Sequence, residues 1–221
     1  MFKRLLADRD SYITNRVING TRRTSANLGT AGSLDLFKLY GQTSTGSVPN
    51  LELSRLFIHF DLSPVRKLID SGKIDTNNAS FRCMLGMSDV NGGQTVPPRF
   101  VVNVCPLSRS FEEGLGRDVV YYADSDVCNF LTGSRAQGPW LMSGCGMAGG
   151  VSGPCDYITG SSTTSFVATQ TFSTGEEDMY VDVTAAVSAT LAGIIPDEGF
   201  RISFSETEET DLRSYFVKRF S

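Results

Sequence analysis

The sequence predicts an all-β fold, an antiparallel two-sheet β-sandwich of the jelly-roll type with long loops and one or two short helices. Three segments, 55–62, 179–183 and 200–204, alternate apolar and polar side chains with the period of two that a half-buried strand requires. Short strand candidates recur along the chain between glycine, proline and asparagine turns, which is typical of two packed antiparallel sheets. A chain of 221 residues can form one such domain with a full core.

The strand candidates follow one another along the chain, each bounded by turn residues. The first, 10–18, ends at the turn dipeptide Asn19-Gly20. The most apolar candidate, 55–62, is predicted to be central, and 79–87 and 99–107 are expected to pair as antiparallel neighbours. The remaining candidates are 34–40, 166–172, 179–183, 200–205 and 214–220. The residues expected to fill the core are Leu56, Ile58, Phe60, Val181, Val183, Phe200, Ile202 and Phe204.

Two short helices and one long irregular region complete the prediction. Pro64 to Ser71 has a proline at its start and Gly72 at its end, and a second helix begins at Thr184. The region from about 110 to 175 has little apolar periodicity and is rich in glycine, so it reads as a loop-rich insertion within the single domain 1–221. A region of this length either has a function or packs its own side chains.

Charge and composition exclude several classes of protein. Lys and Arg number 20 against 24 Asp and Glu, which argues against a broad basic face for nucleic acid. No apolar run reaches membrane-spanning length, and no apolar stretch follows the charged first residues as in a secretory signal. We therefore expect synthesis in a cytoplasm, with neither nucleic acid nor membrane as a partner.

The five cysteines are expected to be mainly free and buried in such a compartment. Cys145 and Cys155 bracket a glycine-rich stretch and are a possible disulfide pair. Cys83 and Cys105 lie in neighbouring strand candidates and are a second possible pair. Spacing alone leaves both pairings open, because it does not show the Cβ geometry.

Acidic residues gather near the start of the long region. Glu112, Glu113 and Asp118, with Asp124 and Asp126 further on, offer the hard oxygen ligands that calcium prefers. A carboxylate pair could also cleave a glycosidic bond, and solvated loop charge is the simplest interpretation. No other cofactor is indicated.

The lone histidine, His59, lies two residues before Asp61 and is either a base held by a carboxylate or an ordinary strand residue. No nucleophile motif accompanies it, since Gly144-Cys145-Gly146 lacks the strand-turn-helix context of a nucleophile elbow. We therefore expect a protein that is not an enzyme.

Four aromatic residues of the long region form a candidate binding site. Tyr121, Tyr122, Trp140 and Tyr157 would make a glycan platform if their rings were exposed for stacking. The alternative is that the rings fold inward and form a satellite core.

The N-terminal segment carries apolar residues that no strand pattern uses. Phe2, Leu5 and Leu6 would form a small adhesive patch if exposed, which favours docking onto a neighbouring subunit. Alternatively, Leu5 and Leu6 close one end of their own sandwich.

Several segments together resemble a known family. They are 10–13 (DSYI), 28–30 (LGT), 54–63 (SRLFIHFDLS), 110–118 (SFEEGLGRD), 181–184 (VDVT) and 199–202 (GFRI), with Trp140 and Tyr157 in a glycine-rich stretch. This order is similar to the DNRLRE-type β-sandwich domains, akin to the family-96 carbohydrate-binding modules, which occur on secreted bacterial proteins and on virion proteins of tailed phages.

The resemblance implies a structural component of a tailed-bacteriophage virion that docks on other virion proteins as a homo-oligomer. Its place would be the neck, tail, baseplate, fibre attachment or capsid exterior, after synthesis in the host cytoplasm. The alternative that the resemblance implies is a carbohydrate-binding module that recognises host surface glycan.

Overall fold

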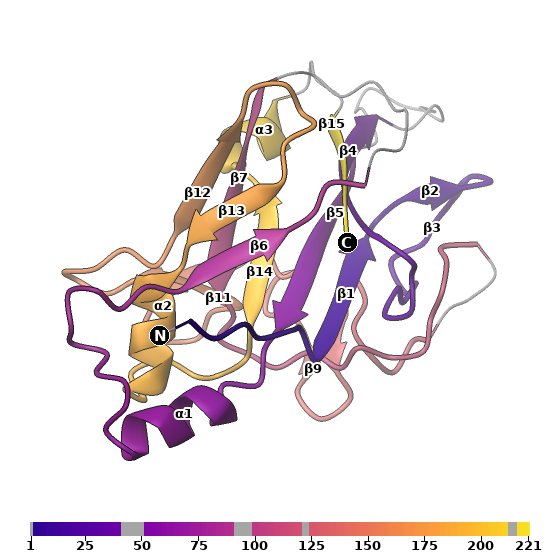
Figure 1. The fold of residues 1–221 in the computed structure, drawn as a ribbon. Helices are drawn as coiled ribbons and strands as arrows, with labels where there is room; N and C mark the ends of the chain where they lie inside the picture. The colour runs from indigo at the N-terminus through magenta and orange to yellow at the C-terminus, as the bar shows by residue number, and fades with distance from the viewer. Residues whose placement is uncertain (1, 41–50, 91–98, 121–123, 212–215) are drawn as a thin grey trace.

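The computed structural model describes residues 2–40, 51–90, 99–120, 124–211 and 216–221, and Figure 1 shows their arrangement. The first strands are β1 (Arg9–Thr14), β2 (Val17–Ile18), β3 (Thr21–Arg22), β4 (Leu34–Tyr40), β5 (Leu51–His59), β6 (Met84–Met87) and β7 (Phe100–Pro106). The later strands are β8 (Thr132–Ser134), β9 (Gly138–Pro139), β10 (Ala148–Gly150), β11 (Tyr157–Gly160), β12 (Ala168–Phe172), β13 (Met179–Asp182), β14 (Phe200–Phe204) and β15 (Phe216–Phe220). The helices are α1 (Ser63–Asp70), α2 (Thr184–Leu191) and α3 (Glu206–Thr210).

The fold is all-β and sandwich-like, as the sequence predicts, and its main sheet is antiparallel. The strand order in this sheet is β12-β7-β14-β5-β4-β15, with β1 also paired to β5. Strand β5 joins the parts of this sheet, because it pairs with three other strands. It pairs with β14 through 56–58, with β4 through 51–53 and with β1 through 54–59. The sheet curls into a half-barrel (Figure 1).

The ribbon of β6 and β13 lies across the concave side of this sheet (Figure 1). Past the end of β6, Ser88 and Ser221 exchange two backbone hydrogen bonds of 3.0 Å, which join the ribbon to the β15 edge. The predicted pairing of 79–87 with 99–107 is wrong. Strand β7 is already paired on both edges, with β12 and β14, and β6 pairs with β13 instead.

The main core fills the space between the curled sheet and the ribbon. Phe100 stacks on Phe172 with ring centroids 4.6 Å apart and meets Phe204 edge-on at 5.5 Å. Every predicted core residue except Phe60 is buried. Phe60 is half-buried. Because β5 ends at His59, Phe60 lies just beyond the strand, and its ring packs at the margin of the core.

A second core lies on the other face of β5. Phe57 and Leu53 point into it, and Phe111, Phe130 and Trp140 of the long region cover them. Part of the region of about 110–175 therefore packs as a second layer, and this region contains the short strands β8 to β12 between its loops. Strand β5 is buried on both faces, which explains its nearly continuous apolar sequence.

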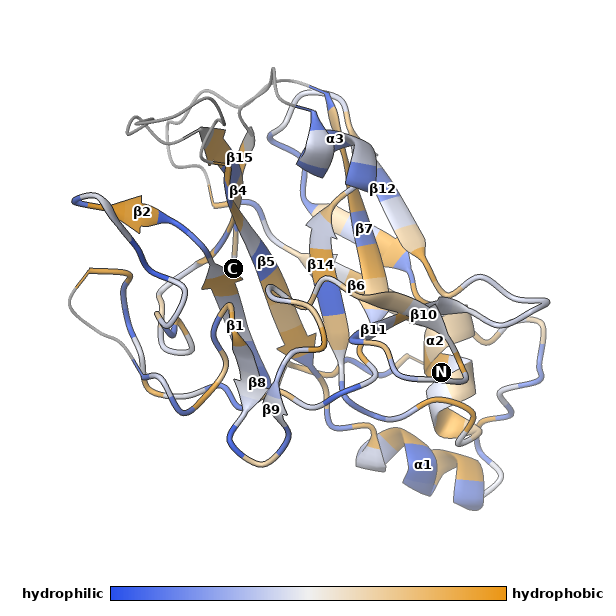
Figure 2. Ribbon diagram, turned by 180° about the vertical axis from the view of Figure 1, so that it is seen from behind, coloured by the Kyte–Doolittle hydropathy of each residue, from blue (hydrophilic) through white to orange (hydrophobic). Residues whose placement is uncertain are grey.

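Two of the helices lie where the sequence predicts them. Pro64 occupies the first turn of α1, whose surface carries both hydrophilic and hydrophobic residues in Figure 2, and α2 begins at Thr184. Within the described ranges, no helix has the length and apolar character needed to cross a bilayer.

Candidate functional site

The second layer carries a short apolar segment at the surface, residues 141–151, which we call the apolar loop. Four of its large apolar side chains are exposed, those of Leu141, Met142, Met147 and Val151. The chain carries no charged residue from 138 to 154. Apolar side chains that gather on one surface element mark interaction sites more often than scattered ones do.

A buried carboxylate fixes the shape of the apolar loop. Asp156 has no exposed surface, and it accepts hydrogen bonds from the backbone N–H groups of Leu141 at 2.9 Å, Met142 at 3.0 Å and Met147 at 3.4 Å. The N–H of Asp156 in turn donates to the carbonyl of Met147 at 2.8 Å. Arg109 supplies a positive charge 3.6 Å from the carboxylate. The loop is therefore held in one conformation before any partner binds.

The turn at the centre of the apolar loop requires glycine. Gly144 has a φ of +79°, and a Cβ there would lie 2.6 Å from both the ring of Phe130 and the guanidinium of Arg55. Cys145 follows with a φ of +57° and is buried beneath the loop. A non-glycine residue rarely adopts this backbone conformation, so the surrounding contacts must enforce it.

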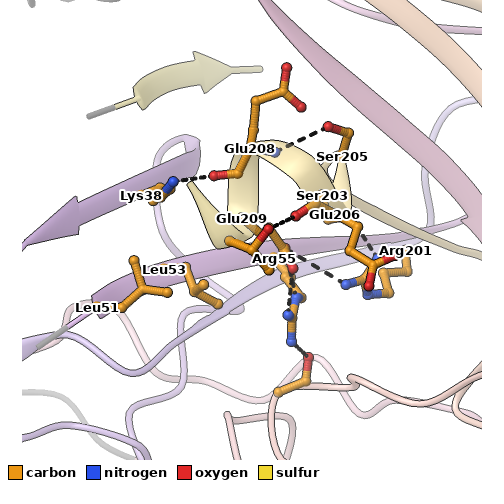
Figure 3. Close-up of polar contacts among 12 residues, drawn as sticks. Lys38, Leu51, Leu53, Arg55, Arg201, Ser203, Ser205, Glu206, Glu208 and Glu209 are labelled. Atoms are coloured by element: carbon orange, nitrogen blue, oxygen red, sulfur yellow. Dashed lines mark hydrogen bonds and ion pairs between the residues drawn. The ribbon is translucent and has the colours of Figure 1, made fainter. Parts of the chain in front are cut away.

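Arg55 of β5 connects the apolar loop to helix α3 (Figure 3). Its Nη1 donates to the Gly144 carbonyl at 2.5 Å, while Nε and Nη2 donate to the two carboxylate oxygens of Glu209 at 3.0 and 2.7 Å. Burial acts to raise the pKa of Glu209, but the adjacent Arg55 outweighs it and holds that pKa below its usual value. Both groups therefore stay charged, and the bidentate pair is rigid.

Arg201 of β14 lies beside this pair. Its Nη1 donates to the Ser203 hydroxyl at 2.6 Å, and Nη2 lies 3.8 Å from Glu209. Its guanidinium also lies 4.3 Å from the centre of the Tyr157 ring. On the same side of the sheet, Lys38 donates to the backbone carbonyls of Glu208 and Asp211, which fastens α3 to β4.

The predicted glycan platform is not formed by the rings that the structure describes. Trp140 is buried, donates from Nε1 to the Asn129 carbonyl at 2.9 Å, and packs 5.3 Å from Phe57. Tyr157 is half-buried beneath Arg201. For Trp140 the satellite-core alternative is confirmed. Tyr121 and Tyr122 lie outside the described residues.

The structure does not bring the candidate calcium ligands together. Glu112 accepts from the N–H of Arg135 at 3.0 Å, Glu113 accepts from the N–H of Asp10 at 3.1 Å, and Asp118 accepts from the N–H of Val120 at 2.7 Å. Each carboxylate thus serves a different part of the backbone. No group of three or more His, Cys, Asp or Glu side chains is placed to hold a metal in the part of the chain that the structure describes.

Neither predicted disulfide is present, and all five cysteines are free. Cys145 packs in the second core and Cys155 in the main core, so the two thiols face different interiors. Burial raises the pKa of Cys145 to about 12 and that of Cys105 to about 11. Thiols that resist ionisation in this way are poor nucleophiles.

The lone histidine has a different partner from the one suggested by its sequence neighbour. Asp61 accepts from the N–H and hydroxyl of Ser63, at 2.9 and 2.8 Å. His59 instead places Nδ1 2.6 Å from the carboxylate of Asp8, and the Asp8 N–H donates to the His59 carbonyl at 3.1 Å. The histidine therefore anchors the N-terminal segment to β5.

The three apolar residues of the N-terminal segment do not behave alike. Leu5 is half-buried and packs against the main core, as the end-closing alternative expects. Phe2 and Leu6 remain exposed, at 88% and 74% of their maximum surface, as a docking segment would require.

No family model, curated protein or solved structure matches this chain. The groups that shape the apolar loop, Asp156, Arg55 and Glu209, have no local sequence signal. The lack of charge from 138 to 154 was the one signal that could have pointed to this surface.

Proposed function

We propose that this protein is a structural component of a tailed-bacteriophage virion that acts through protein–protein docking. Its position would be the neck, tail, baseplate, fibre attachment or capsid exterior. The observation that carries the docking function is the apolar loop, which exposes four apolar side chains on a backbone held by Asp156 and Arg55. The resemblance described above supports the assignment to a virion.

The energetics of the apolar loop suit docking. Burial of an exposed apolar side chain of this size contributes about 1.5–3 kcal/mol. Because the loop is already ordered, association loses little of this gain to ordering the backbone. Met142 and Met147 add unbranched, polarisable side chains that adapt to an irregular partner surface.

The N-terminal segment supplies a second contact. Phe2 and Leu6 point outward, while Leu5 and the Asp8–His59 contact anchor the segment to the body. A subunit with two separate adhesive elements can join neighbours on two sides, which is how rings and stacked layers form. We propose a homo-oligomer that also contacts other virion proteins.

The proposal assigns no catalytic step to the buried charges. Arg55, Glu209, Arg201 and Asp156 are engaged with one another or with the backbone, and their contacts hold the two layers and the apolar loop in place.

One structural feature supports the carbohydrate-binding alternative. An open groove of about 720 Å³ is lined by glycine, valine, serine and threonine residues of the segments 150–152 and 159–165. These hydroxyl groups could bond to a sugar, but the lining contains no aromatic ring on which a sugar could stack. This absence favours docking as the main function.

Cofractionation tests the proposed function. Particles assembled in the cell that makes this chain should, after density-gradient purification, contain it at a constant ratio to the major particle protein, as measured by quantitative mass spectrometry. Recovery of the chain only among free proteins would contradict the proposal. Retention of the free chain on host envelope polysaccharide, but not on an unrelated polysaccharide, would support the carbohydrate alternative.

A further inference from the structure

A lysine is buried in the main core at the end of the chain. Lys218 of β15 is 1% exposed, and its Nζ lies 5.2 Å from the centre of the Phe172 ring and 5.3 Å from that of Phe220. Both rings are fully buried. An ammonium group in such surroundings has lost most of its hydration, which is unfavourable unless a partner compensates.

The partner is a carboxylate from a distant part of the chain. Nζ of Lys218 lies 2.6 Å from Oδ1 of Asp89, which follows β6 and is 129 residues away in sequence. The carboxyl carbon is one bond beyond that oxygen, so nitrogen and carbon lie close to the roughly 3–3.5 Å at which two held groups react.

The turn between β12 and β13 positions both groups. The Gly175 carbonyl accepts a second hydrogen bond from Lys218 Nζ at 2.9 Å. Oδ1 of Asp178 accepts from the N–H of Asp89 at 2.7 Å. The same turn thus holds both the Lys218 amine and the Asp89 backbone. Because the two groups are already positioned, their reaction avoids the loss of conformational entropy that normally slows a reaction between two side chains.

We propose that Lys218 and Asp89 condense to form an intramolecular amide that links β15 to the segment after β6. The ammonium first passes a proton to the carboxylate across their contact, which yields a neutral amine and a neutral acid. The amine nitrogen then attacks the carboxyl carbon, the C–N bond forms and the C–OH bond breaks. The hydroxyl leaves with a second proton from nitrogen as water, so the reaction needs no oxidant and no cofactor.

The surroundings favour this product. The condensation replaces the buried ammonium of Lys218 and its partly buried Asp89 partner by a neutral amide, which removes the cost of keeping the ammonium charge out of water. It also ties the final strand to the ribbon next to the Ser88–Ser221 hydrogen bonds. A covalent link across a long stretch of sequence restricts the unfolded chain, and this stabilises the fold.

The intact mass of the purified, folded full-length chain, measured after denaturation, tests the proposal directly. We expect a mass lower than the sequence mass by one water, about 18 Da. Trypsin should then fail to cut after Lys218, and a branched peptide should join Lys218 to Asp89. The full sequence mass, or a water loss with normal cleavage after Lys218, would overturn the proposal.

Variants supply the controls. Lys218→Arg keeps the positive charge but cannot form this amide, and Asp89→Ala removes the carboxyl group, so both should show the full mass expected from their sequence. Asp182→Ala, which removes an exposed carboxylate that pairs with Arg82 at 3.9 Å, should keep the water loss. If Lys218→Arg or Asp89→Ala fails to fold, the presence or absence of the branched peptide in the unmodified chain still decides the question.

Discussion

Single buried polar side chains organise the second layer. Asn27 has no exposed surface; its Nδ2 donates to the carbonyls of Glu113 and Cys128, both at 2.7 Å, and its Oδ1 accepts from the N–H of Gly116 at 2.7 Å. Asp156 does the same for the apolar loop. Each side chain satisfies several backbone groups that no strand pairs, which lets an irregular segment be buried without loss.

Removal of the Asp156 carboxylate should therefore destabilise the protein and loosen the apolar loop. Asp156→Ala leaves three backbone N–H groups without their acceptor, and we expect the free energy of unfolding to fall by about 3–5 kcal/mol. Urea unfolding measures this loss, and limited proteolysis should show faster cleavage within 141–151. Asp126→Ala, at an exposed site, is the control and should change stability by less than about 0.5 kcal/mol. An equally small change for Asp156→Ala would show that the carboxylate does not hold the loop.

The sequence alone predicts the burial of some individual residues and not of others. Alternation identifies the core face of β13, because burial on one face leaves a period of two. Strands β5 and β14 are buried on both faces, so alternation identifies their residues in the main core but not the packing of their other face. No sequence pattern predicts the burial of Asp156, because that burial depends on distant segments that fold around it. The sequence leaves two roles open for Trp140, a ligand platform or a core ring, and only the path of the chain around it decides between the two.

At the scale of elements, the turn between β12 and β13 is held by one carboxylate. Glu177 accepts from the N–H groups of Ser173 and Thr174, each at 2.8 Å, and of Gly175 at 2.9 Å. Desolvation acts to raise the pKa of Glu177, but the backbone donors of Thr174 and Ser173 outweigh it and lower the pKa from 4.5 to about 2. This turn presents the Gly175 carbonyl to Lys218, so its geometry affects the end of the main core.

The depressed pKa of Glu177 predicts a stability contribution that depends on pH. Because the folded state prefers the carboxylate, the contribution is complete above the unfolded pKa of 4.5 and is lost as the pH falls toward about 2. Glu177→Gln should therefore lower the urea midpoint at neutral pH, and the difference from the unmodified protein should shrink below about pH 4. Glu176→Gln, at the exposed neighbouring position, is the control. A difference that is the same at neutral and acid pH would contradict the role of the charge.

The existence of elements is easier to predict from sequence than their pairing. Strands β4, β5, β7, β12, β13, β14 and β15 lie within or close to the predicted ranges, because each keeps a local apolar pattern. Their partners are set by contacts between distant segments, so the expected hairpin of 79–87 with 99–107 is not formed. The short strands β8 to β11 have too few residues to show any period.

On the scale of the whole molecule, two cores share one strand. Strand β5 packs Leu56 and Ile58 into the main core and Phe57 into the second core, and its Arg55 reaches both the apolar loop and α3 (Figure 3). The layer that carries the apolar loop is therefore fastened to the sandwich by apolar packing and by the hydrogen bond from Arg55 to the Gly144 carbonyl. The apolar loop is thus held on a packed body, as the proposed docking requires.

The most direct test of docking through the apolar loop is the incorporation of a loop variant into particles. Leu141→Ser combined with Met142→Ser removes two exposed apolar side chains and should leave the free energy of unfolding unchanged. Loss of two such contacts should reduce occupancy in gradient-purified particles at least about tenfold. The control is Ile194→Ser, which removes an exposed apolar side chain outside the loop and should assemble normally. If the loop variant assembles at the occupancy of the unmodified chain, docking through this loop is contradicted.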